Sequence, residues 1–149
     1  MSEEPYWNAL VPELTVTQLE ASLRFYRAAG FSIRFRREDP PFAYLELGPA
    51  QIMLEQEHAD GWRVASLERP LGRGINFQIE IEDVEAIAAA LAAAGFVPFK
   101  AMKESWYAVD AQTEEGQREF LIQDPDGYLF RFAQPLGSRP LASDLRLAG

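Results

Sequence analysis

Two stretches of the chain alternate apolar and polar residues, and a helical pattern follows each. Residues 10–16 (LVPELTV) and 74–81 (GINFQIEI) have the two-residue period of a half-buried strand. After each stretch, apolar residues recur at intervals of three and four, which predicts an amphipathic helix. The helix positions expected to face inward are Leu19, Leu23 and Tyr26 in the first copy and Val84, Ile87, Ala88 and Leu91 in the second.

These two strand-and-helix segments are copies of one another. Residues 16–31 and 81–96, offset by 65 positions, are identical at six of sixteen sites and both end in AAGF. Gly30 and Gly95 stand where a helix takes a left-handed residue to end. Thr17 and Glu20 have the spacing of a capping box at the start of the first helix. We interpret the repeat as a duplicated module.

Three further strands fit after each predicted helix. In the first half they are SIRFRRE, FAYLELG and QIMLEQE; in the second they are VPFKAMKE, YAVDAQ taken with REFLIQ, and YLFRFAQ. Gly48-Pro49 and Asp124-Pro125-Asp126-Gly127 are turn sequences that join neighbouring strands as hairpins. The pattern predicts an α+β fold of two tandem βαβββ modules in one domain over residues 1–149, with modules 9–60 and 74–136 and a C-terminal tail at 137–149.

Composition excludes several functional classes. The 149 residues contain no cysteine, so thiolate zinc sites are excluded, and the single histidine, His58, removes most histidine-based metal or triad chemistry. A net charge of −9 disfavours nucleic acid as a partner. The sequence has neither a signal-peptide core nor a membrane-spanning apolar run, so we expect a cytoplasmic protein without a membrane partner.

A duplicated βαβββ unit that ends in DPDGYLFRF and contains SLRFYRAAGF resembles the vicinal oxygen chelate superfamily. That superfamily includes glyoxalase I, extradiol dioxygenases, fosfomycin-inactivating enzymes and bleomycin resistance proteins. The resemblance covers roughly residues 9–136. It implies that the strands of each module curl into a cup whose concave face holds the site, with helices on the convex face.

The resemblance also implies where metal ligands would lie, because enzymes of this superfamily place one on the first and one on the last strand of each module. Here those positions hold Val11 and Asn76 on the first strands and Met53 and Arg131 on the last. Glu55, one pleat beyond Met53, is the only acid close enough to substitute. A guanidinium cannot coordinate a cation, so we expect neither a metal nor another cofactor.

The acidic chain without these ligands is most similar to the bleomycin resistance branch, which the segment GQREFLIQDPDGYLFRF also resembles. That branch consists of non-catalytic dimers that sequester a cationic glycopeptide between subunits. We therefore predict a homodimer that binds a cationic aromatic small molecule on flat rings and carboxylates. From the ligand positions that the resemblance implies, together with strand parity and loop aromatics, the expected ligand-binding residues are Tyr44, Glu46, Met53, Glu55, Trp62, Asn76, Gln78, Trp106, Tyr107 and Arg131.

Two alternatives stay open at the level of sequence. One is a metal-dependent lyase, isomerase or dioxygenase of the same superfamily acting on a small oxygenated substrate, which would need a ligand set around Glu55. The other is a sensor whose cup binds an unrelated metabolite. Arg131 beside a cationic ligand is favourable only if a carboxylate pairs with it, and Glu46 and Glu55 are the expected partners.

Overall fold

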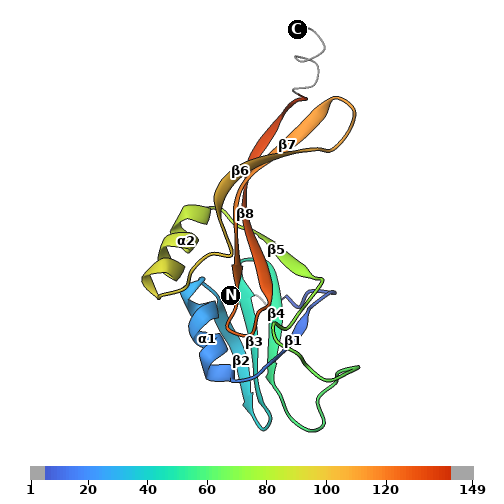
Figure 1. Ribbon diagram of the computed structural model, residues 1–149, viewed down its shortest axis with the longest axis vertical. Coiled ribbons are helices and arrows are strands. Elements are labelled where there is room, and N and C mark those ends of the chain that lie inside the picture. Colours follow the sequence, from blue (N-terminus) through green and yellow to red (C-terminus); the bar gives the residue numbers. More distant parts are fainter. Residues whose placement is uncertain (1–5, 142–149) are drawn as a thin grey trace, which may run out of the picture. The chain divides into compact units, whose positions relative to one another are not determined.

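The computed structural model describes residues 6–141, which form two compact units. The first contains the described residues up to Leu71 together with Asp124–Gly127, and the second contains Gly72–Gln123 and the described residues from Tyr128 onward. Each unit has a four-stranded sheet and one helix, in the order strand, helix, strand, strand, strand (Figure 1). The α+β class and the tandem βαβββ modules are therefore confirmed.

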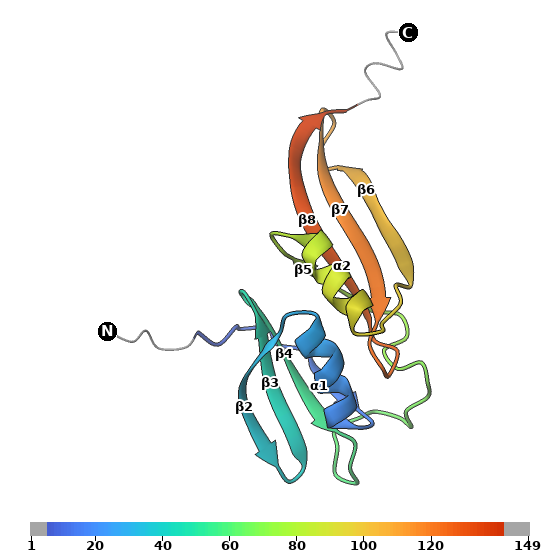
Figure 2. The same cartoon turned by 90° about the vertical axis from the view of Figure 1, so that its left-hand side faces the viewer.

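The first unit has its strands in the order β1-β4-β3-β2. Strands β1 and β4 are parallel, and the other neighbours are antiparallel. Helix α1 lies along one face of this sheet, against β3 and β4 (Figure 2). The elements are β1 Glu13–Val16, α1 Leu19–Ala28, β2 Ser32–Glu38, β3 Pro41–Leu47 and β4 Ala50–Gln56.

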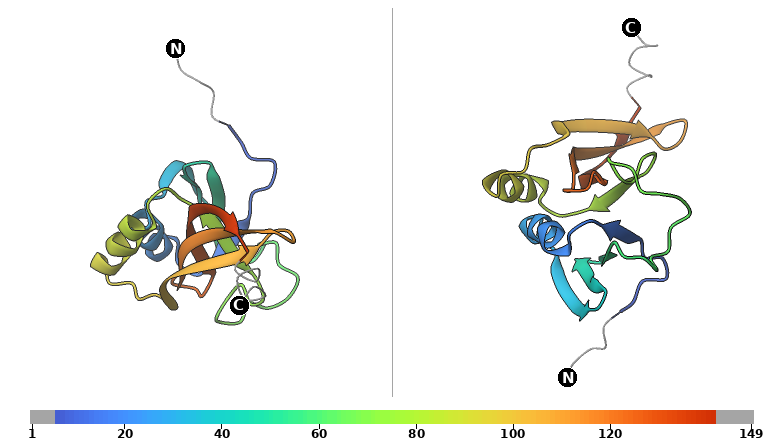
Figure 3. Two further views of the ribbon diagram at one scale, coloured as in Figure 1. Left: turned by 90° about the horizontal axis from the view of Figure 1, so that it is seen from above. Right: turned by 60° about the horizontal axis from the view of Figure 1, so that its bottom comes forward.

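The second unit repeats this arrangement with the strand order β5-β8-β7-β6. Strands β5 and β8 are parallel, and α2 lies on one side of the sheet, against β7 and β8 (Figure 3). The face of each sheet opposite its helix is called its open face below. The elements are β5 Asn76–Glu80, α2 Val84–Ala93, β6 Lys100–Ala108, β7 Thr113–Gln123 and β8 Leu129–Pro140.

The cores lie between each sheet and its helix, as the apolar periodicity predicts. In the first unit the predicted inward positions of α1 are all buried. In the second, Val84 and Leu91 are buried while the alanines between them are mostly exposed, because α2 is alanine-rich and covers less surface. The sheet residues that complete these cores are Leu14, Val16, Leu45, Ile52 and Leu54 in the first unit and Ile79, Phe120, Ile122, Phe130 and Phe132 in the second.

The first residue of each helix makes an equivalent hydrogen bond, which the sequence repeat does not reveal. The backbone N–H of Leu19, the first residue of α1, donates to the side-chain oxygen of Gln56 at 2.9 Å. The N–H of Val84, the first residue of α2, donates in the same way to Gln134 at 3.1 Å. Each glutamine comes from the last strand of its own module, so the duplication extends to the way each helix start is satisfied.

The predicted capping box at Thr17 and Glu20 is wrong. Gln18 occupies the N-cap position and its side chain makes no capping hydrogen bond. The hydroxyl of Thr17 instead donates to Asp126 at 2.6 Å, and its backbone N–H donates to the same carboxylate at 3.0 Å. A buried carboxylate offers a charge-assisted partner, which outcompetes the local cap.

The turn Asp124–Gly127 lies between β7 and β8 in sequence but packs with the first unit. Asp124 accepts a hydrogen bond from the hydroxyl of Tyr26 at 2.6 Å, and it also accepts one from the backbone N–H of Asp126. Gly127 has a φ of 108°, which a residue with a side chain rarely adopts. The predicted hairpin turn is confirmed, and both of its aspartates are buried.

Two predicted strand boundaries change. YAVDAQ does not join REFLIQ, because β6 ends at Ala108 and β7 begins at Thr113 after a tight turn. Asp110 makes that turn by accepting hydrogen bonds from the N–H groups of Gln112 and Thr113 at 2.8 Å. The last strand continues to Pro140 by pairing with β7, so the predicted tail begins as strand, and residues 142–149 lie outside the described part.

Neither helix of the described chain is long and apolar enough to cross a membrane.

The turn contacts generate a test of stability. Asp126 is 2% exposed and also pairs with Arg69 at 2.6 Å, so Asp126→Ala leaves the Thr17 donors without their acceptor. We expect the free energy of unfolding to fall by about 1–3 kcal/mol in urea denaturation. Glu20→Ala is the control, since this exposed residue makes only a surface ion pair with Arg36 and should change stability by less than about 1 kcal/mol. Equal effects in the two variants would contradict the role of the turn.

Candidate functional site

Strand alternation in the second unit sends charged residues to the open face of its sheet. In β7, Phe120 and Ile122 are buried in the core, so Glu119 and Leu121 point to the opposite face. In β8, Phe130 and Phe132 are in the core and Arg131 faces the other way. Arg131 pairs in register with Leu121 of β7 and Gln78 of β5, so it lies in the middle of the sheet.

A bulge in β6 brings two lysines to the same open face. Residues three apart in a regular strand point to opposite faces, but the register of β6 against β7 shifts between Lys100 and Lys103. Lys100 pairs with Leu121 and Lys103 with Glu119, and both lysines line the same cavity. These are the only two lysines among the 149 residues, because the other twelve of the 14 basic residues are arginines.

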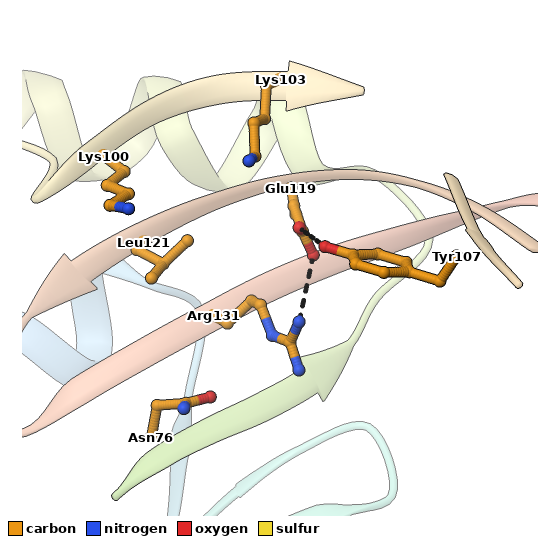
Figure 4. A pocket seen from close by; sticks show the side chains of 7 residues that line it. All are labelled: Asn76, Lys100, Lys103, Tyr107, Glu119, Leu121 and Arg131. Atoms are coloured by element: carbon orange, nitrogen blue, oxygen red, sulfur yellow. Dashed lines mark hydrogen bonds and ion pairs between the residues drawn. The ribbon is translucent and has the colours of Figure 1, made fainter. Parts of the chain in front are cut away.

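The carboxylate of Glu119 is the centre of this face. Its side chain is 2% exposed, and its Oε1 accepts a hydrogen bond from the hydroxyl of Tyr107 at 2.5 Å. Its Oε2 lies 3.7 Å from Nη1 of Arg131, which is an ion pair without a hydrogen bond. Figure 4 shows the tyrosine hydroxyl and the guanidinium converging on this carboxylate.

Two polar atoms of this cluster lack a partner. Within residues 6–141, Oε2 of Glu119 and Nε of Arg131 are buried and have no hydrogen bond. Such atoms carry a desolvation cost that a bound molecule can relieve. The two side chains that carry these atoms line a cavity of about 240 Å³, called the Glu119 pocket below, whose lining consists of Asn76, Lys100, Lys103, Tyr107, Glu119, Leu121 and Arg131.

The open face of the first unit has a different character, because aromatic rings fill it. Phe35 stacks on Tyr44 with ring centroids 5.5 Å apart, and Trp7 meets Tyr44 edge-on at 4.9 Å. Tyr44 also hydrogen-bonds to the side chain of Gln51, which in turn donates to the carbonyl of Tyr6. Residues 6–8 therefore cover part of this face, and Tyr44 is only 5% exposed.

Acidic residues gather at another part of the same face. Glu13 of β1 pairs in register with Met53, and Glu55 lies one pleat further along β4. Partial desolvation, followed by the negative charge of Glu55, raises the pKa of Glu13, while Arg37 opposes the shift. Glu55 also contacts the ring of His58 at 2.5 Å. Glu13 and Glu55 therefore place two carboxylates on this part of the face, and Arg37 offsets their negative charge only in part.

The structure distributes the predicted site residues over several places. Asn76, Tyr107 and Arg131 come together in the Glu119 pocket. Arg131 does pair with a carboxylate, but the predicted partners are wrong: Glu46 pairs with Arg34 at 2.5 Å and Glu55 with His58. Tyr44, Glu46, Met53 and Glu55 share the open face of the first unit, as strand parity predicts.

The remaining predicted residues do not reach the pocket. Trp106 lies in β6 and not in a loop, with its ring against Gly116 and the guanidinium of Arg139 3.6 Å from its centroid. Trp62 is 92% exposed in the segment between modules. Gln78 is exposed on β5 and is not among the residues that line the Glu119 pocket.

Four pocket residues were not predicted from the sequence: Lys100, Lys103, Glu119 and Leu121. The alternation of REFLIQ carried a signal for two of them, because apolar Phe120 and Ile122 must face the core and leave Glu119 and Leu121 on the other side. The lysines carried no such signal, since their shared face depends on the bulge. In a regular strand without the bulge, either Lys100 or Lys103 would face the helix side of the sheet.

The residues present do not fit the metal that the resemblance implies for the enzymes. Arg131 occupies the last-strand position and directs its guanidinium into the pocket beside Asn76. A cation there would also meet both lysines, with Glu119 as the only carboxylate lining the pocket. Among the described residues, no three histidine or acidic side chains are grouped to hold a metal ion. We derive no chemistry through a metal.

Several solved structures have this fold at low sequence identity. TioX from Micromonospora sp. ML1 is 19% identical, with 87% of this chain and 100% of that chain covered and a TM-score of 0.65. The virulence protein STM3117 from Salmonella typhimurium is 22% identical, with 88% and 98% covered and a TM-score of 0.62. A bleomycin-binding protein complexed with bleomycin is 20% identical, with 86% and 98% covered and a TM-score of 0.57.

At these identities the likeness shows the fold alone. Among curated proteins, none matches the sequence. The family model described as Glyoxalase/Bleomycin resistance protein/Dioxygenase superfamily matches residues 9–132. Because that match spans most of the chain and agrees with its two βαβββ modules, this chain belongs to the Glyoxalase/Bleomycin resistance protein/Dioxygenase superfamily.

Proposed function

We propose that this chain is a cytoplasmic small-molecule binding protein that holds its ligand in the Glu119 pocket and releases it unchanged. The observation that carries this proposal is the pair of buried polar atoms, Oε2 of Glu119 and Nε of Arg131, which have no hydrogen bond in the described chain and belong to side chains that line a cavity. A protein that evolved only to fold would satisfy or remove such groups. A ligand with complementary groups recovers the energy that they cost.

The chemistry of the pocket supports binding more than turnover. Arg131 stands where the superfamily resemblance places a metal ligand, and a guanidinium is neither a ligand nor a base. The carboxylate of Glu119 is already engaged by Tyr107 and Arg131. These residues position and hold a ligand, and none of them is an activated nucleophile.

Binding without turnover is tested by dialysis against a small-molecule extract of the source cell. We expect one compound to concentrate with the wild-type chain, to be absent with Glu119→Gln, and to be recovered unchanged after hours of incubation, as followed by mass spectrometry. Glu115→Gln is the matched control, since Glu115 lies on the same strand and bonds to Ser138 outside the pocket. Consumption of the compound with formation of a product would show that the chain is an enzyme.

A second candidate is the sequestration of a cationic aromatic antibiotic of bleomycin type by a homodimer. The open face of the first unit favours it, because aromatic rings lie there together with the acidic pair Glu13 and Glu55. Partial desolvation is the main cause of the raised pKa of Glu13, and the negative charge of Glu55 adds to it; a cationic ligand would relieve this second contribution. The Glu119 pocket does not favour a cation, since three basic side chains face one carboxylate.

This candidate predicts saturable binding of metal-free and copper-loaded bleomycin at one ligand per chain, measured by calorimetry and tryptophan fluorescence. Glu55→Gln should weaken it roughly tenfold, as expected for a charge-assisted contact. Trp106→Ala should leave the affinity unchanged, because Arg139 and Gly116 already enclose that ring. Absence of both heat and quenching at high ligand concentration would exclude bleomycin as the ligand.

The acidic pair also predicts a pH-dependent stability. A carboxyl whose pKa is raised in the folded state binds its proton more tightly there, so its contribution is most favourable below the unfolded value of 4.5 and is lost as pH rises through the folded pKa. Glu13→Gln removes the ionisable group, so the variant does not lose this contribution to stability as pH rises. We expect the variant to be more stable than wild type at pH 7, by about 0.5 kcal/mol or less as is usual for surface positions, with the advantage disappearing at acidic pH.

Urea denaturation at pH 7 and pH 4 measures the difference. Glu38→Gln serves as a control at another exposed acid of the first unit. If Glu13→Gln were destabilising at pH 7, the charge of Glu13 would be favourable and the proposed excess of negative charge on this face would be wrong.

A further inference from the structure

The only two lysines of the chain line one pocket, although the chain as a whole is strongly acidic. With 23 acidic residues against 14 basic ones, most surfaces of this protein repel anions. The Glu119 pocket contains Lys100, Lys103 and Arg131 against the single carboxylate of Glu119. Its local charge therefore has the opposite sign to that of the chain.

The positive charge belongs mainly to the lysines. Arg131 lies 3.7 Å from the carboxylate of Glu119, so these two charges largely offset each other. Among residues 6–141, the side chain of neither lysine makes a hydrogen bond or an ion pair. Two ammonium groups on the rim of a cavity, on flexible stems, are suited to bind an anion that enters from solvent.

At the carboxylate of Glu119 the pocket favours a hydrogen-bond donor and not an anion. Oε2 of Glu119 is an acceptor with no donor, and the carboxylate is 2% exposed, so water reaches it poorly. Its remaining lone pairs need an O–H or N–H group from the ligand. A simple anion without a donor would leave this atom unsatisfied and would also be repelled by it.

We propose that the Glu119 pocket binds a small organic acid whose carboxylate contacts Lys100 and Lys103 and whose hydroxyl group donates to the carboxylate of Glu119. This inference rests on the proposed function and names the class of ligand. A cavity of about 240 Å³ lies below the roughly 300–1,000 Å³ typical of drug-sized ligands, so the acid is compact. Leu121 supplies the apolar wall, and the opposed charges fix the orientation of the ligand.

The two lysines make a selective probe of this site. Reductive methylation with carbon-13 formaldehyde labels Lys100, Lys103 and the chain amino terminus, and it preserves the positive charge of each. The labelled chain is titrated with three compounds at constant ionic strength: glycolate, which has both groups; acetate, which lacks the hydroxyl; and glycolamide, which lacks the charge. Constant ionic strength separates binding from general screening.

We expect both lysine signals to shift saturably with glycolate in the millimolar range. Acetate should bind roughly tenfold more weakly because the hydrogen bond to Glu119 is lost. Glycolamide should produce no saturable shift. Glu119→Gln should reduce the preference for glycolate over acetate, and Lys103→Gln should weaken both acids, whereas Arg118→Gln, a neighbour on β7 that pairs with Glu85 of α2, should change neither.

Each contrary result has a distinct meaning. No saturable lysine shift with glycolate, or equal binding of glycolamide, overturns the inference and leaves the proposed binding function intact. Equal affinity for acetate and glycolate in the wild-type chain overturns the role assigned to Glu119. If glycolate binds as expected but is consumed, as followed by its proton signal, the inference stands and the proposed function without turnover fails.

Discussion

The turn Asp124–Gly127 is the constraint on which the site depends, because it fixes the register of β7 against β8. Gly127 closes the turn in a left-handed conformation, and its N–H donates to the carbonyl of Asp124. From that closure Gln123 pairs with Leu129, and the same register holds as far as the pair Gln117 and Pro135, before a shift between Gly116 and Gln117. A shift of one residue would send Glu119 and Arg131 to the helix side and Phe120 and Phe132 to the open face. The buried aspartates of the turn make such a shift costly because their hydrogen-bond partners are fixed.

The same register explains why a buried charge is tolerated in the second unit. Glu119 lies opposite Ala133 of β8, beside the core residue Phe120, and is almost completely buried. The hydroxyl of Tyr107 and the guanidinium of Arg131 offset most of its desolvation cost. Both Glu119 and Arg131 line the cavity.

Duplication produced two sheets with the same topology and different surfaces. The first is covered by aromatic rings, the segment at residues 6–8 and a group of acids, whereas the second has an open cavity with basic residues at its edge. In both helices, nevertheless, the N–H of the first residue donates to a glutamine side chain from the last strand of the same module. The two modules therefore share the features that support the fold and differ in the residues on their open faces.

Local patterns along the chain were enough to predict the fold class, the repeat, the core positions of α1 and the hairpin turn, because these depend on periodicity and on glycine and aspartate chemistry. In α2 only Val84 and Leu91 of the four predicted inward positions are buried. The resemblance to the superfamily placed Asn76 and Arg131 at one site, and both line the Glu119 pocket. The pairing of Arg131 with Glu119, the use of Thr17 as a donor to Asp126 and the position of Trp106 were decided only by tertiary structure. The convergence of Lys100 and Lys103 is the clearest case, since a single bulge in β6 reverses the parity between them. A bulge is a compromise between strand pairing and packing, and no short-range pattern in the sequence specifies it.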